Sequence, residues 1–362
     1  MASDTLSEIG HVAADVMTSL PAALPLGDRR LHFGGPDLEP RALRNLLKRR
    51  IEAVPPGGEI AWTTYYFRDR DLASALLSAC DRGVHVHLRM EGMPRCKTAN
   101  ANVLQMLRAH GLGGRLQVSG AEAWKHSRFG NLHSKIYVFS HPVPTAFVGS
   151  FNPSGDTPED EAIISEIGDQ DRGHNLLVEF TEPDVVAALR HRAIHSPGVL
   201  GRLGPAQNRA IRNLQTTIWH YPRLAPDVVG RHLRSLKQPT VSAAISHLKG
   251  GSLAAALCDI ARKGGNVRLI VHDTERRVPS RAVAELKTAG VAVHRFSNDE
   301  GLPMHCKFLL ASDAGTETAF LGSLNHNLRS YYLNEEVLVA TREPEIVSAL
   351  KARMEQLVAM CR

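Results

Sequence analysis

Two segments of this chain carry the same pair of short motifs in the same order. Each is a His-x-Lys dyad followed, after an apolar stretch, by Gly-Ser-x-Asn. The four motifs are His133-x-Lys135 and Gly149-Ser150-x-Asn152 in the first copy, and His305-x-Lys307 and Gly322-Ser323-x-Asn325 in the second. The histidine precedes the glycine by 16 residues in the first copy and by 17 in the second. A repeat of this kind predicts two similar structural units.

The repeat extends beyond the motifs. In both copies an amphipathic segment ends at a glycine, an alternating apolar stretch follows, and a second amphipathic segment comes next. These are residues 71–83, 84–88 and 98–109 in the first copy, and 252–264, 266–270 and 279–288 in the second. The pattern predicts an α/β protein of two similar lobes, each a mixed β-sheet flanked by helices. We expect a pseudo-twofold relation between the lobes, with the active site between them.

Composition along the chain suggests where these units begin and end. Residues 1–38 are rich in proline and are predicted to form an N-terminal arm, before a first lobe over 39–195. Residues 196–237 are interpreted as a Gly/Pro-rich linker followed by a helical stretch, and 238–362 as the second lobe. Residues 156–172 have no counterpart in the second copy and are interpreted as an inserted loop.

The paired motifs indicate phosphodiester chemistry. Residues i and i+2 of a strand project from one face, so each copy presents an imidazole beside an ammonium group. One imidazole can attack phosphorus while a second protonates the leaving oxygen. Lysines and fixed amide or hydroxyl donors stabilise the charge that builds on the phosphate oxygens. One copy supplies half of these groups, so both copies are needed for one site.

Composition narrows the class of protein only slightly. The chain has 362 residues, 43% hydrophobic, with a net charge of +6 and a pI near 9.2, which favours anionic partners without choosing among them. There is no signal-like N-terminus and no apolar run of 18 residues, and the five cysteines are scattered without a Cys-x-x-Cys. We therefore predict a cytoplasmic protein without structural zinc. His85 and His87 share a strand face but lack a third ligand nearby, so no metal site and no cofactor are predicted.

At these motifs the chain resembles the phospholipase D superfamily, whose signature is His-x-Lys-x4-Asp followed by Gly-Ser-x-Asn, present twice. The resemblance covers roughly residues 57–192 and 238–345, and residues 328–337 are similar to cardiolipin synthases. It implies metal-independent cleavage through a phosphohistidine, with one histidine as nucleophile and the other as general acid. We favour His133 as the nucleophile, which makes His305 the acid.

The resemblance also implies roles for the remaining site residues. Lys135 and Lys307 would bind phosphate, and Glu336 would hydrogen-bond a catalytic histidine and fix its tautomer. The residues implied to support the phosphate oxygens are Ser150, Asn152, Ser323 and Asn325.

The chain departs from the family pattern at three positions. The motif aspartate is replaced by Ser140 in the first copy and Ser312 in the second, where Asp313 follows one residue late. The position that matches Glu336 in the first half is Asn175, with Glu179 as a weaker candidate on the same strand face.

The substrate stays open at this stage. A phospholipid, with peripheral contact to a membrane, is favoured by the cardiolipin-synthase-like context, whereas the basic pI allows a nuclease or nucleotide phosphodiesterase. A small-molecule phosphodiester is a further alternative, and so is a non-catalytic scaffold that binds an anionic ligand. No obligate protein partner is implied. Tyr65, Tyr66 and Phe67 either line the cleft or pack in the core.

Overall fold

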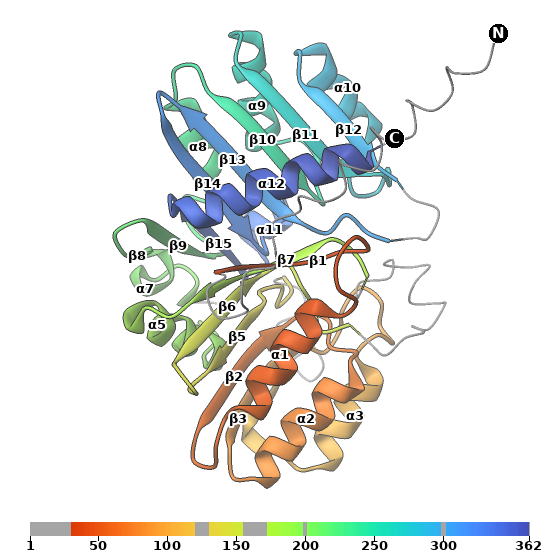
Figure 1. The fold of residues 1–362 in the computed structure, drawn as a ribbon, viewed down its shortest axis with the longest axis vertical. Helices are drawn as coiled ribbons and strands as arrows, with labels where there is room; N and C mark the ends of the chain where they lie inside the picture. Colours follow the sequence, from red (N-terminus) through yellow and green to blue (C-terminus); the bar gives the residue numbers. More distant parts are fainter. Residues whose placement is uncertain (1–29, 120–129, 155–171, 198–200, 298–301, 362) are drawn as a thin grey trace, which may run out of the picture. The chain divides into compact units, whose positions relative to one another are not determined.

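A computed structural model describes residues 30–119, 130–154, 172–197, 201–297 and 302–361. Residues 31–362 form one compact unit, which contains two β-sheets, each covered by helices (Figure 1). Most of the predicted arm and of the predicted 156–172 insertion lies outside the described residues.

The two sheets share the same order over seven strands, and the second sheet has an additional edge strand, β8. In the described part of the chain, the first sheet runs β1 (Leu31–Gly34), β7 (Asn175–Phe180), β6 (Thr145–Gly149), β5 (Ile136–Phe139), β2 (Glu59–Thr64), β3 (His85–Glu91), β4 (Leu116–Ser119). The second runs β8 (Ile211–Arg212), β9 (Thr216–Tyr221), β15 (Glu336–Thr341), β14 (Thr316–Gly322), β13 (Lys307–Asp313), β10 (Thr240–Ile245), β11 (Asn266–His272), β12 (Ala292–Phe296). In each, three strands are parallel and the others antiparallel. The predicted α/β class with mixed sheets is confirmed.

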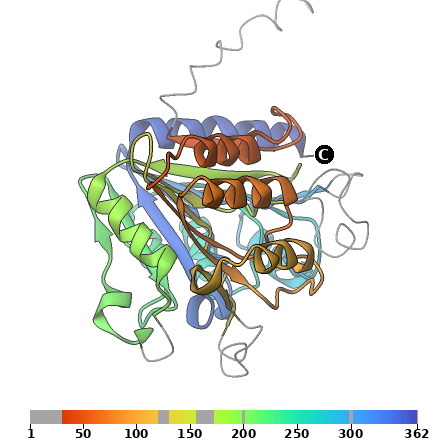
Figure 2. The same cartoon turned by 90° about the horizontal axis from the view of Figure 1, so that it is seen from below.

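Helices cover the outer face of each sheet. They are α1 (Ala42–Glu52), α2 (Arg70–Asp81) and α3 (Ala101–Ala109) on the first sheet, and α8 (Val228–Arg234), α9 (Ser252–Arg262) and α10 (Ser280–Thr288) on the second. Figure 2 shows the first three side by side. Asp69 caps α2 by accepting the Leu72 N–H, and Gly83 follows the helix with a φ of 91°. The helices and strands predicted from the repeat are confirmed.

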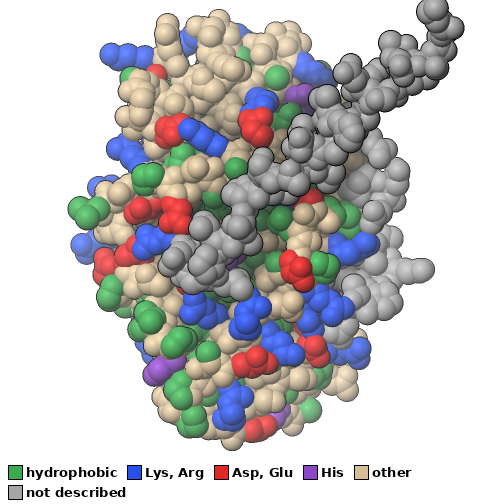
Figure 3. All heavy atoms as spheres, in the orientation of Figure 1, with side chains coloured by type: hydrophobic (Ala, Val, Ile, Leu, Met, Phe, Trp, Pro, Cys, Tyr) green, Lys and Arg blue, Asp and Glu red, His purple; other side chains and the backbone are tan. Residues whose placement is uncertain are grey.

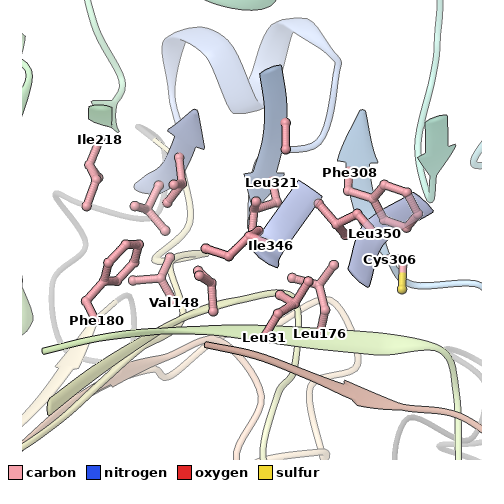
Figure 4. Packing of buried hydrophobic residues seen from close by; sticks show 14 of the residues in the cluster. Leu31, Val148, Leu176, Phe180, Ile218, Cys306, Phe308, Leu321, Ile346 and Leu350 are labelled. Carbon is pink, nitrogen blue, oxygen red and sulfur yellow. The ribbon is translucent and has the colours of Figure 1, made fainter. Parts of the chain in front are cut away.

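Two further helices lie on the inner faces and help to join the lobes. α5 (Pro183–Ile194) and α12 (Pro344–Met360) contribute to one buried apolar cluster that includes residues of both sheets. Figure 4 shows part of this cluster, with Val148 and Leu176 of the first sheet and Leu350 of α12 facing Leu321. Because the two sheets share this core, the lobes pack as one unit. The remaining short helices are η1 (Gly113–Arg115), α7 (Pro205–Asn208) and α11 (Leu328–Tyr332).

Two predicted boundaries are wrong. The helical stretch expected over 206–236 contains β9, which pairs with β15 inside the second sheet. The predicted arm contains β1, which pairs with β7. Their places in the sheets are set by long-range pairing, of β1 with β7 and of β9 with β15, which local sequence does not reveal, although β9 also pairs with the two-residue strand β8 just before it. β1 and β9 occupy matching places, and the repeat therefore begins at these strands.

The cysteines and helices bear on two further expectations. All five cysteines are free, and burial raises the pKa of the Cys306 thiol to about 11, as expected for a packed structural thiol. Among the described helices, none is both long and apolar enough to cross a membrane.

Candidate active site

Both motif histidines line one cavity of about 930 Å³. They lie in extended segments directly before β5 and β13. The backbone N–H of His133 donates to the Glu335 carbonyl at 2.9 Å, and that of His305 donates to the His174 carbonyl at 3.0 Å. Each histidine is thus tied to the chain just before the last strand of the opposite lobe, so the two half-sites meet.

The side chain of each motif histidine also forms a hydrogen bond with a residue of the opposite lobe. His133 Nδ1 lies 2.9 Å from Glu336 Oε2, and His305 Nδ1 lies 2.8 Å from Asn175 Oδ1. A carboxylate or amide oxygen only accepts, so both rings carry their proton on Nδ1 in these bonds. The Nε2 atoms remain for the cavity. The predicted roles of Glu336 and Asn175 as histidine partners agree with this geometry.

The backbone contacts between the two lobes also come in matching pairs. Leu132 forms a parallel bridge with Glu335, and Met304 forms the matching bridge with His174. An approximate twofold axis produces such pairs, because each contact from the first lobe to the second is matched by the equivalent contact from the second lobe to the first. The arrangement agrees with the expected pseudo-twofold and with a site between the lobes.

The glycine of each Gly-Ser-x-Asn motif is needed for close backbone approach. A Cβ on Gly149 would lie 2.1 Å from the Leu176 carbonyl oxygen, and one on Gly322 would lie 2.3 Å from the Val337 carbonyl oxygen. This approach brings the next residue, a serine, against the strand that carries the histidine partner.

The motif serines act on the histidine partners, which corrects their predicted role. Ser150 Oγ donates to Asn175 Oδ1 at 3.2 Å, and Ser323 Oγ donates to Glu336 Oε2 at 2.6 Å. Both hydroxyls are buried and also accept a backbone N–H from β7 or β15. They hold the partner oxygen in place and do not line the cavity.

The two motif asparagines differ. Asn152 Oδ1 accepts the Tyr66 N–H at 3.2 Å and lies outside the cavity wall. Asn325 lines the cavity, and its buried Oδ1 has no hydrogen-bond partner among the described residues. Only Asn325 is therefore placed to meet a ligand.

The two lysines lie behind their histidines. Lys135 Nζ donates to the His133 carbonyl at 2.6 Å, and Lys307 Nζ donates to the His305 carbonyl at 2.8 Å. Burial lowers the pKa of Lys135 to about 7, and that of Lys307 well below its ordinary value. Each ammonium has further donors, and phosphate binding through them stays a prediction.

The electrostatics of the two histidines are unequal. Burial lowers the pKa of His133 to about 4, against the opposing effect of Glu336. Burial, Lys307 and Arg277 lower the pKa of His305 well below its ordinary value, and no carboxylate of the described residues is hydrogen-bonded to it. Burial alone would raise the pKa of Glu336, but His133 and Lys135 hold it below its ordinary value. The site therefore holds a carboxylate at one histidine only.

The structure corrects the prediction for Glu179 and gives roles to the residues at the missing motif aspartates. Glu179 is not in the site: four residues along β7 from Asn175, it contacts His32 at 2.8 Å and Arg50 at 2.6 Å. Where the motif aspartate is missing, Ser140 Oγ accepts the Glu59 N–H at 2.7 Å. Asp313 accepts two backbone N–H groups of residues 237–238. Ser140 thus binds the backbone at the start of β2, and Asp313 binds the backbone just before β10. Both have a structural role.

Behind the histidine partners, a second layer of arginines also forms contacts from each lobe to the other. These arginines were not identified from the sequence. Arg192 of α5 reaches Glu335 at 3.4 Å, and Arg353 of α12 lies 2.9 Å from His174 Nδ1. Arg89 also donates to Glu335, at 3.0 Å. Both helices begin with a proline, and aligning these prolines matches Arg192 to Arg353, a signal that extending the repeat would have revealed.

The cavity wall contains other residues beyond the motifs. Tyr65 and Tyr66 line it, with the Tyr65 ring 4.9 Å from the His133 ring, whereas Phe67 packs in the core of the first lobe. The second lobe contributes His247 and Arg277 to the same wall. In the described ranges, no group of three or more His, Cys, Asp or Glu side chains could hold a metal.

Comparison with known proteins decides the family. The family model described as cardiolipin synthase, PLD-like domain, matches residues 56–162 and 234–358, more than half of the chain. The chain belongs to the phospholipase D superfamily. This membership confirms the predicted family and supports an enzyme of phosphodiester chemistry.

Among relatives, 106 residues are 34% identical to the mitochondrial cardiolipin hydrolase of Xenopus laevis. The match covers 29% of this chain and 48% of that protein, so the chain spans about half the length of this relative.

Two solved structures share the superfamily fold over most of the chain. Phosphatidylserine synthase of Haemophilus influenzae has a TM-score of 0.62 at 11% identity, covering 91% of this chain and 86% of that one. Polyphosphate kinase of Porphyromonas gingivalis has a TM-score of 0.59 at 14% identity, covering 91% and 50%. At these identities the likeness shows the fold alone.

Proposed function

We propose that this chain cleaves a phospholipid-type phosphodiester through a phosphohistidine, and then passes the phosphatidyl group to water or an alcohol. The observation that carries the proposal is the exchanged pairing of two histidines in one cavity, each held at Nδ1 by the opposite lobe. The family model and the cardiolipin hydrolase relative support the lipid class.

In the first step, the lone pair of His133 Nε2 forms a bond to phosphorus. The bond from phosphorus to the leaving oxygen breaks, its electron pair stays on that oxygen, and His305 Nε2 supplies the proton. In the second step, the oxygen of water or an alcohol bonds to phosphorus and gives its proton to His305. The phosphorus–nitrogen bond breaks and its electron pair returns to His133.

The charges support His133 as the nucleophile. Bond formation to phosphorus places positive charge on the imidazole, and the buried Glu336 carboxylate opposes that charge from 2.9 Å. Asn175 offers His305 no charge, so a protonated His305 gives up its proton readily. A bound phosphodiester anion raises the pKa of both histidines and so loads His305.

A substrate panel tests the proposal. We expect turnover of phosphatidylglycerol or phosphatidylcholine, and of bis-p-nitrophenyl phosphate, with EDTA present. His133→Ala should lower turnover by at least ~10³-fold. His85→Ala, which alters an exposed histidine of β3, is the matched control. Equal rates for wild type and His133→Ala on every substrate would refute the proposal.

A nuclease is the second candidate, because the basic side chains of Arg95, Lys249 and Arg276 line the cavity. The uncovered part of the face drawn in Figure 3 carries both basic and acidic side chains. Single-stranded DNA belongs in the panel for this reason. Cleavage of DNA alone, falling steeply with salt, would replace the lipid by a nucleic acid.

A further inference from the structure

The mouth of the cavity exposes several large apolar side chains. Met93 (49% exposed), Leu328 (72%) and Tyr332 (55%) line the cavity, and Leu333 (37%) follows directly. They come from the β3–α3 loop of the first lobe and from α11 and the residue after it in the second. Single exposed apolar residues are ordinary, but a group around one opening marks an interaction surface. We call these four residues the apolar rim.

The α11 part of the apolar rim is held in place from within. The Asn327 side chain caps this one-turn helix by accepting the Ser330 N–H at 3.0 Å. The buried Tyr331 hydroxyl lies 3.0 Å from His326 Nδ1, next to the motif residue Asn325. Leu328 and Tyr332 are four residues apart and share the opposite, exposed side of the turn. The turn therefore presents its apolar side outward.

Basic side chains lie among the apolar ones. Arg95, Lys249, Arg276 and Arg329 line the same cavity and are exposed. Within the described ranges, no ion pair is recorded for Lys249 or Arg276. The acidic residue in this wall, Asp227, is already engaged by Arg234 and by the Gly230 N–H at 3.1 Å. The mouth thus combines apolar contact area with positive charge.

We propose that the apolar rim and the basic residues Lys249 and Arg276 dock the cavity mouth on an anionic phospholipid bilayer. Leu and Met side chains gain by leaving water for the acyl boundary, and Lys and Arg gain from the negative surface. Three of the four rim residues are aliphatic, and Tyr332 is the one ring among them on which a base could stack, so the rim suits a bilayer better than a single nucleic-acid strand. The inference rests on the proposed function for its substrate class, but its test does not require turnover.

Vesicle sedimentation with the full chain tests the docking surface. The probes are vesicles of phosphatidylcholine alone and of phosphatidylcholine with phosphatidylglycerol. We expect binding to the anionic vesicles that weakens roughly tenfold in Leu328→Ser/Tyr332→Ser. Lys249→Glu and Arg276→Glu should each weaken it roughly fivefold or more.

Leu214→Ser is the matched control, because Leu214 is fully exposed and lies before β9 at the end of that strand away from Glu336. It should bind like wild type. Thermal unfolding midpoints of all variants are compared, since these exposed positions should leave folding intact.

Any of three results would overturn the inference: no binding of wild type to anionic vesicles, wild-type binding by the rim variant, or equally weakened binding by Leu214→Ser. Charge reversal that abolishes binding to single-stranded DNA but not to vesicles would assign the mouth to nucleic acid. Turnover of bis-p-nitrophenyl phosphate without vesicle binding would leave the proposed reaction standing and remove only the docking surface. Vesicle binding without turnover of any substrate would do the reverse.

Discussion

The two halves of the site hold their histidines with the same geometry and different chemistry. His133 faces the carboxylate of Glu336, whereas His305 faces the neutral amide of Asn175, at nearly equal distances. A buried serine fixes the acceptor oxygen in both halves. The geometry therefore comes from the duplicated fold, and the difference lies in one charge. In the proposed mechanism, that charge gives the two histidines separate roles.

Removing the charge should have the largest effect. Glu336→Gln keeps a partner for His133 but leaves both halves uncharged. We expect kcat to fall by about 10²–10⁴-fold, since nothing opposes the positive charge on the attacking imidazole.

Asn175→Ala is the comparison for the other half and should cost less, because it removes an orienting bond and no charge. Steady-state kinetics on bis-p-nitrophenyl phosphate measures both. A larger loss for Asn175→Ala would contradict the assignment of roles.

Replacing the arginines of the second layer, Arg192 and Arg353, should lower the stability of the fold. Arg353 pairs with Asp37 at 2.5 Å and contacts His174, while Arg192 shares Glu335 with Arg89. Arg353→Met leaves the buried His174 Nδ1 without its guanidinium partner, whereas the exposed Asp37 carboxylate returns to water, so we expect the free energy of unfolding to fall by about 1–3 kcal/mol.

Arg192→Met should cost less, because Arg89 still neutralises Glu335. Urea unfolding compares the two variants with Arg281→Met, an exposed arginine of α10. Equal and small effects would show that this layer does not hold the lobes together.

The motif asparagines should separate binding from stability. Asn325→Ala removes a cavity-lining amide, so we expect kcat/KM to fall by roughly 10–100-fold with little change in unfolding. Asn152→Ala leaves the Tyr66 N–H without its acceptor and should cost about 1–2 kcal/mol of stability. Kinetics and thermal unfolding of both variants decide this, and a reversed pattern would place the phosphate on the first-lobe side.

Placing a carboxylate beside both histidines should shift the pH profile of kcat. In Asn175→Asp, a carboxylate beside His305 raises its pKa, so the general acid stays protonated to higher pH. The basic limb of the kcat profile should then move upward by roughly 1–2 pH units. An unmoved basic limb, with wild-type rates elsewhere, would mean that His305 does not donate the proton.

Much of this arrangement could be predicted from the repeat, because it extends over whole elements. The segments around His133 and His305 predicted paired half-sites, and the helices ending at Gly83 and Gly264 were found from local patterns. Asn175 was recognised by its match to Glu336. These features depend on short-range sequence or on comparison of one copy with the other.

Other features depend on long-range pairing, which local sequence does not encode. β1 and β9 take their places in the sheets by pairing with β7 and β15, which are far away in the sequence. Ser150 and Ser323 seemed suited to phosphate, yet the close approach at the preceding glycine turns them toward Asn175 and Glu336. Glu179 shares a strand face with Asn175, but the length of strand between them places its carboxylate against His32 and Arg50 instead.

The central claim is that one charge makes His133 the nucleophile. Rapid quenching of the wild-type enzyme during turnover, followed by mass spectrometry under basic conditions, would locate the acid-labile phosphate adduct. The account predicts an adduct on His133, and its accumulation when His305 is replaced by Asn with a substrate whose leaving group needs no proton. An adduct on His305 in the wild-type enzyme would contradict it.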